Sequence, residues 1–159
     1  MIVLEESIHV QKDLSPVFKY TSDFGNIQDW DPGVIASKKK TAGTVGVGSV
    51  YDLTLKFGPF RPGMQYVITE YTPNVRVVLK GKGDAFSATD TISFIQTGDG
   101  TRIDYQAKIE FSGFADHLEI FLRPILKKTG EDAIKGKLVR GRQPCRSGSD
   151  NCCCLSTHV

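Results

Sequence analysis

Apolar and polar residues alternate along most of the middle of the chain. In "SATDTISF" (Ser87–Phe94), every second residue falls on the same face, the period expected for a half-buried strand. Short turns rich in glycine and proline separate the alternating segments, and such short links favour an antiparallel meander with one face toward the core. The pattern predicts six successive strands, over Val34–Thr41, Ser49–Phe57, Gly63–Tyr71, Val75–Lys82, Ala85–Gln96 and Thr101–Phe111.

The segment before these strands carries a different pattern. Ile2–Val10 alternates weakly and is expected to be a first strand. The stretch "DLSPVFKYTSDF" predicts a short helix with Ser15 as its N-cap and Pro16 at its first position. A second short helix is expected over "DFGNIQDWDPG", where the turn Asp31-Pro32-Gly33 ends it. Near the other end, Asp99-Gly100 suits the positive φ angles of a tight hairpin turn.

A long helix is predicted after the last strand. It starts after Ser112-Gly113, and Pro124 inside it predicts a kink. A single amphipathic helix can bury its apolar stripe only against the sheet. The stripe consists of residues at helical spacing, namely Phe114, Leu118, Phe121, Leu122, Ile125 and Leu126.

Composition limits the classes of protein to consider. The chain has 159 residues, 40% of them hydrophobic and 24% charged, with a net charge of +2. Mixed charge with one short basic run, Lys38–Lys40, gives no argument for nucleic-acid binding. There is no apolar run long enough to span a membrane and no signal-peptide pattern, so we expect a cytoplasmic protein. The three histidines lie on separate elements, and we predict neither a metal site nor a cofactor.

The last twenty or so residues differ from the rest. We divide the chain into a main domain, residues 1–138, and a polar tail, residues 139–159. All four cysteines lie from Cys145 onward, so the main domain has no disulfide framework. The tail is interpreted as a disordered or non-native appendage. Two alternatives are lipidation or soft-metal binding by Cys152–Cys154, and capture of the C-terminus by a partner domain.

One acidic residue interrupts the apolar side of the strand pattern. Asp90 is in register with Ala88, Ile92 and Phe94, so alternation places its carboxylate on the face that should be buried. An ionised carboxylate in an apolar environment is costly unless it is paired, and otherwise its pKa rises. Asp90 is therefore the first candidate for a functional residue. The alternative is a structural role in which Arg76 or a backbone amide satisfies the carboxylate.

The order of elements and several motifs resemble the START-like, or Bet v 1-like, superfamily (SRPBCC), and within it the polyketide cyclase/dehydrase and lipid-transport group. The resemblance rests on "SPVFKYTSDFGNIQDWDPGV", "GVGSVYDL", "YVITEYTPNVRVVL" and "DTISF" with "GDGTRIDYQAKIEF", and it covers roughly residues 1–136. It implies an α+β helix-grip fold. In that fold a curved antiparallel sheet of about seven strands wraps around the long C-terminal helix, two short helices follow the first strand, and a ligand cavity lies between sheet and helix.

Strand alternation and the resemblance together predict which residues line this cavity. Asp90, His117 and Tyr105 are the candidates for acid/base chemistry, because a carboxyl, an imidazole and a phenol can each transfer a proton. The alternative is a purely structural role, in which the tyrosines belong to the core and His117 lies on a helix surface. The predicted ligand-binding residues are Tyr51, Leu53, Leu55, Met64, Tyr66, Ile68, Val77, Phe86, Ala88, Asp90, Ile92, Tyr105, Phe114, His117, Leu118 and Phe121.

These features predict a carrier of a hydrophobic or amphipathic small molecule, lipid-like or polyketide-like. An alternative is a cyclase, dehydratase or aromatase that uses the Asp, His and Tyr side chains as acid and base. A second alternative is a module that binds a partner through its C-terminal tail. We favour the carrier, because the sequence shows no activated nucleophile or acid/base pair. We expect a monomer or a homodimer without nucleic-acid partners.

Overall fold

The computed structural model describes residues 1–56, 58–84 and 86–111. Within them an antiparallel sheet of seven strands is built on the predicted segments. The elements in chain order are β1 (Ile2–Val10), α1 (Leu14–Ser22), the 3-10 helix η1 (Phe24–Asn26), α2 (Ile27–Trp30), β2 (Val34–Lys39), β3 (Val50–Leu55), β4 (Gly63–Thr72), β5 (Arg76–Lys82), β6 (Phe86–Thr97) and β7 (Gly100–Phe111). The long helix predicted after Ser112-Gly113 and the tail lie outside the described residues.

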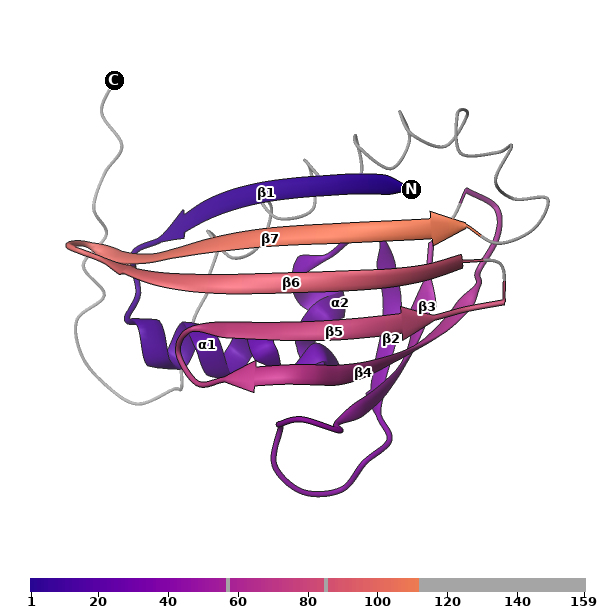
Figure 1. Ribbon diagram of the computed structural model, residues 1–159, viewed down its shortest axis with the longest axis horizontal. Coiled ribbons are helices and arrows are strands. Elements are labelled where there is room, and N and C mark those ends of the chain that lie inside the picture. The colour runs from indigo at the N-terminus through magenta and orange to yellow at the C-terminus, as the bar shows by residue number, and fades with distance from the viewer. Residues whose placement is uncertain (57, 85, 112–159) are drawn as a thin grey trace, which may run out of the picture.

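The sheet joins the first strand to the last. Its strand order is β1-β7-β6-β5-β4-β3-β2, so six consecutive strands form a meander and β1 pairs with β7 at its far edge. Figure 1 shows α1 and α2 on one side of the sheet. We call the face that these helices cover the inner face, and the opposite one the outer face. In the described part of the chain, no helix is long and apolar enough to cross a membrane.

The inner face holds the core because strand alternation directs apolar side chains to it. Side chains from the short helices complete the packing. Phe18 of α1 packs edge-on against Tyr71 and Phe94, with ring centroids 5.2 and 5.0 Å apart. Phe24 of η1 lies against Tyr66, at 5.6 Å between centroids. Each buried aromatic ring removes a large apolar area from water, so these contacts fix the helices on the sheet.

Two local predictions were wrong in detail. Helix α1 has Asp13, not Ser15, as its N-cap, which puts Pro16 at the third helical position. The first N–H groups of a helix have no partner within it, so proline is tolerated there as well. In the β6–β7 hairpin the linking residues are Gly98 and Asp99, and positive φ occurs at Gly100 and not at Asp99. A Cβ at Gly100 would lie 2.1 Å from the carbonyl oxygen of Val10, so glycine is required there.

Candidate functional site

Asp90 lies in the middle of β6 and on the inner face, as the alternation predicted. Its neighbours across the strands are Leu79 on β5 and Ala107 on β7. Only 2% of the residue is exposed. Among the described residues, no group donates a hydrogen bond to its Oδ1 atom. A buried acceptor without a donor is rare in folded proteins and calls for an explanation.

Arg76 does not satisfy the Asp90 carboxylate, so this alternative from the sequence is wrong. That guanidinium instead binds Glu70, with Nη2 2.6 Å and Nε 2.8 Å from Oε1. A register shift between Ile68 and Glu70 explains the pairing, because the bulge changes which residues of β4 lie opposite β5. The ion pair is about half exposed, well away from the apolar environment of Asp90.

Small residues make room for a tyrosine to reach Asp90. Tyr66 of β4 is opposite Gly81 of β5, and Gly81 is opposite Ala88 of β6. A Cβ built on Gly81 would lie 2.5 Å from Cζ and 2.7 Å from Cε1 of Tyr66. The ring therefore lies across β5 at the place where that strand has no side chain, and its phenol extends toward β6. Both phenols that act on Asp90, those of Tyr66 and Tyr105, come from inner-face positions.

Tyr105 approaches Asp90 from the other side. It lies on β7 opposite Ile92, two residues along from the partner of Asp90. This diagonal position on a neighbouring strand is within reach of an aromatic side chain. Trp30 of α2 packs edge-on against the Tyr105 ring, with 6.2 Å between centroids. The indole Nε1 of Trp30 is buried and has no acceptor among the described residues. Helix α2 thus covers the part of the inner face where Tyr105 approaches Asp90.

A second carboxyl, which the sequence reasoning missed, belongs to the same cluster. Asp31 follows α2 directly, and its Oδ1 accepts a hydrogen bond of 2.7 Å from the backbone N–H of Gly33. Burial raises the pKa of Asp31, and this hydrogen bond opposes the rise. Its negative charge raises the pKa values of Asp90, Tyr66 and Tyr105. The sequence predicted the Asp31-Pro32-Gly33 turn, but no local pattern indicates that the turn packs against the sheet. We call Asp31, Asp90, Tyr66 and Tyr105 the acidic cluster.

Burial raises the pKa of each member of the acidic cluster. Burial raises the pKa of Asp90 to about 7; the Tyr105 phenol lowers it, the Asp31 carboxylate raises it and the Tyr66 phenol lowers it. Burial, followed by the charge of Asp90, raises the pKa of Tyr66 and of Tyr105 well above the usual range. Hydrogen bonding from the two phenols therefore favours the charged form of Asp90, whereas its Oδ1 atom has no donor among the described residues. Near neutral pH the carboxyl can either donate or accept a proton.

The structure places the other predicted ligand residues of the described chain on the inner face. Tyr51, Leu53, Met64, Ile68, Val77, Ala88 and Ile92 are buried, and Leu55 and Phe86 pack against them at partial exposure. The Tyr51 hydroxyl is buried without a hydrogen bond of good geometry within the described residues. Burial and then the charge of Asp23 raise the pKa of Tyr51. Four predicted residues lie outside the described residues, namely Phe114, His117, Leu118 and Phe121.

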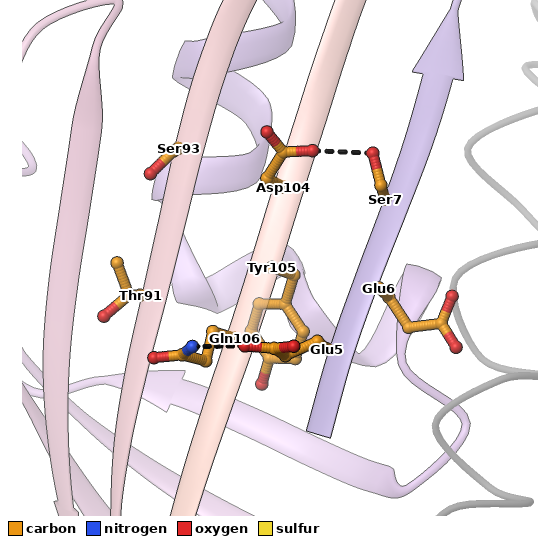
Figure 2. A pocket seen from close by; sticks show the side chains of 8 residues that line it. All are labelled: Glu5, Glu6, Ser7, Thr91, Ser93, Asp104, Tyr105 and Gln106. Carbon is orange, nitrogen blue, oxygen red and sulfur yellow. Dashed lines mark hydrogen bonds between the residues drawn. The ribbon is translucent and has the colours of Figure 1, made fainter. Parts of the chain in front are cut away.

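An open depression on the outer face is a weaker candidate for the site. Its volume is about 430 Å³, and it follows β1, β7 and β6. Its polar groups bind one another: Ser7 donates to Asp104 at 2.6 Å and Gln106 donates to Glu5 at 2.6 Å (Figure 2). Sites for small molecules are usually concave and mainly apolar, whereas this depression is open and lined mostly by polar and charged residue types. Two of its lining residues, Glu6 and Tyr105, are at inner-face positions of their strands. The others are at outer-face positions, namely Glu5, Ser7, Thr91, Ser93, Asp104 and Gln106.

The described residues contain no group of three or more His, Cys, Asp or Glu side chains that could hold a metal ion. The acidic cluster contributes two carboxyls, and its other members are phenols. Its chemistry is therefore that of hydrogen bonding and proton transfer.

Comparison with known proteins identifies the family. A family model described as polyketide cyclase / dehydrase and lipid transport matches residues 1–140. The chain belongs to this family. Membership supports a role in binding a hydrophobic ligand or in cyclase chemistry, and it does not distinguish the two. No curated protein matches the chain.

Solved structures show the same fold at low sequence identity. A protein from Thermus thermophilus, TTHA0849, is 14% identical with a TM-score of 0.71, over 85% of this chain and 93% of that one. A START superfamily protein from Mycobacterium smegmatis is 14% identical with a TM-score of 0.62, over 84% and 97%. The Zhui aromatase/cyclase from Streptomyces sp. R1128 is 11% identical with a TM-score of 0.65, over 83% and 86%. The fold is therefore the Bet v 1-like, helix-grip fold, as the sequence predicted.

Proposed function

We propose that the protein binds a hydrophobic or amphipathic small molecule against the inner face of its sheet. The apolar part of the ligand would contact the aromatic and aliphatic side chains there, at about 25 cal/mol per Å² of buried apolar surface. The acidic cluster would orient its polar end. The observation that carries the proposal is the Oδ1 atom of Asp90, which is buried and has no donor among the described residues. A ligand group that binds this atom would offset the cost of its burial.

Native mass spectrometry of the protein purified from its host tests the proposal. We expect a bound small molecule that is released when the protein is denatured. The matched variants are Asp90→Asn in the cluster and Asp52→Asn on β3, whose side chain interacts with Gln65 and Lys40 instead. Ligand occupancy should fall in the first variant and stay unchanged in the second. A wild-type protein that is always empty, even after incubation with a lipid extract, would contradict the proposal.

A second candidate function is proton transfer next to a carbonyl group. Two observations favour it: the pKa of Asp90 is raised to about 7, and two phenols act on the same carboxyl. A general base works best when its pKa is near the working pH, and a phenol can polarise a carbonyl oxygen by donating to it. The structural likeness to an aromatase/cyclase agrees with this chemistry at the level of the fold.

The enzyme hypothesis has its own test. A thioester carrying a short poly-β-ketone chain is incubated with the protein, and the cyclised aromatic product is followed by its absorbance. If the protein is an enzyme of this kind, Asp90→Asn should abolish turnover while the thioester still binds. Binding of the thioester by the wild type without any product would leave the carrier function and exclude this reaction. A partner-binding role of the tail remains a prediction, because residues 139–159 lie outside the described residues.

A further inference from the structure

In the described part of the chain, the ionisable groups that act on Asp90 are all carboxyls or phenols. Among the described residues, Asp31 acts on it through its charge and Tyr66 and Tyr105 act through hydrogen bonding, and none of the three is a cation. Its strand neighbours, Leu79 and Ala107, are apolar. Glu6 of β1 is opposite Tyr105 in register, but its side chain points away from β7 (Figure 2). Within the described residues, then, the centre of the inner face has two carboxyls and no positive charge to balance them.

Aromatic rings pack against the two tyrosines of the acidic cluster. Trp30 packs against Tyr105, with 6.2 Å between their centroids. Phe24 contacts Tyr66 at 5.6 Å and Trp30 at 6.2 Å. The faces of such rings carry partial negative charge and attract cations, most strongly where water is excluded. Rings together with a buried carboxylate therefore form an environment suited to an organic cation, and no described residue supplies Asp90 with such a balancing charge.

We infer that the acidic cluster selects ligands whose polar end is a protonated amine attached to an apolar body. An ammonium group supplies up to three donors, one of which can donate to the Oδ1 atom of Asp90, and it balances a buried negative charge. A carboxylate or phosphate at the same place would add a like charge to Asp31 and Asp90, which is unfavourable in an apolar site. This inference rests on the proposed binding function and specifies its ligand class.

Three probes with the same ten-carbon chain separate the possibilities: decylamine, 1-decanol and decanoate. Trp30 is the only tryptophan of the chain, so its fluorescence reports on the cluster during a titration. At pH 8 we expect decylamine to bind about tenfold or more tightly than either of the other two, a difference of one charge-assisted contact. Equal affinity for all three, or a preference for decanoate, would overturn the inference and leave the binding function. If none of the three binds, the binding function fails as well.

The pH dependence gives a second readout. A primary amine stays protonated at pH 6 and pH 8, whereas Asp90, with its pKa raised to about 7, changes from mostly neutral to mostly ionised. If only the ionised carboxylate binds the amine, affinity for decylamine rises about tenfold between these pH values. Asp90→Asn should abolish both the rise and the preference over 1-decanol, and Asp52→Asn should keep both. A decylamine affinity that falls with pH, or a rise that survives in Asp90→Asn, would overturn the inference.

Discussion

Two aspartates on neighbouring strands have opposite environments. Asp104 lies on the outer face of β7, with 39% of its side chain exposed, and it accepts hydrogen bonds from Ser7 and Arg102. Asp90 lies on the inner face of β6, is 2% exposed and has no donor for Oδ1 in the described chain. Both are the same residue type in the same kind of strand. Their positions in the two-residue repeat decide which acid faces solvent and which faces the core.

The different environments of Asp104 and Asp90 predict different contributions to the stability of the fold. Ion pairs on a solvated face contribute about 0–1 kcal/mol, so replacing Asp104 changes little. A carboxyl buried without a cation opposes folding, and it is retained in a core only where something else favours it. We interpret that favouring factor as ligand binding. Substitutions on the inner and the outer face test this interpretation.

The largest expected effect is on the pH dependence of stability. The ordinary pKa of an aspartate is 3.8, and the pKa of Asp90 in the folded protein is about 7. Between these values the folded state keeps a proton that the unfolded state has lost, so a rise in pH favours unfolding. The free energy of unfolding of Asp90→Asn minus that of the wild type should therefore increase by about 4 kcal/mol from pH 4 to pH 8. Urea unfolding of both proteins at several pH values measures this difference in the free energy of unfolding.

Asp31 titrates in the same direction, because burial also raises its pKa. The difference between variant and wild type removes most of this shared contribution. A difference that stays constant across the whole pH range would show that the Asp90 carboxyl is not destabilised by burial, and the contrast with Asp104 would lose its basis.

The next effect comes from closing the space that Tyr66 occupies. In Gly81→Ala the new Cβ would lie 2.5 Å from the Tyr66 ring and 2.8 Å from Cε of Met64, so these side chains must move. Overpacking of this kind costs about 1–3 kcal/mol. The matched control is Gly98→Ala, where nothing lies within 4 Å of the added atom. Thermal unfolding should show a clear loss for the first variant and almost none for the second.

The fold could be predicted from the sequence because its signals are local. A two-residue period, short turns and a terminal hairpin are properties of contiguous segments, and each of the seven predicted strands is present. Asp90 was found for the same reason, since a single strand is enough to show an acid on an apolar face.

The rest of the cluster needs contacts that no single segment contains. Asp31 lies in a turn that is ordinary in the sequence, and only the packing of α2 on the sheet brings it near β6. The role of Gly81 depends on Tyr66 of the adjacent strand. The Arg76–Glu70 pair was missed because a bulge in β4 changes the register, and strict alternation cannot show where an extra residue is inserted.

A smaller effect is expected from removing one phenol at a time. Both phenols lower the pKa of Asp90, and Tyr105 does so more than Tyr66. Tyr105→Phe should therefore raise that pKa further than Tyr66→Phe does. NMR titration of the Asp90 side-chain carboxyl measures the order. Tyr71→Phe is the control, because Tyr71 is not among the groups that act on Asp90. The reverse order, or an equal response to the control, would contradict the proposed geometry of the cluster.

The smallest effect belongs to the outer face. Ser7→Ala removes the hydroxyl that donates to Asp104 at 2.6 Å on a solvated surface. Water can replace the lost donor there, so the free energy of unfolding should fall by no more than about 1 kcal/mol. Asp104→Asn keeps an acceptor oxygen and should lose no more than that. Urea unfolding at pH 8 measures both. A loss from Ser7→Ala as large as the Asp90→Asn difference would mean that the outer contacts matter as much as the buried carboxyl, and burial alone would not explain how the two aspartates differ.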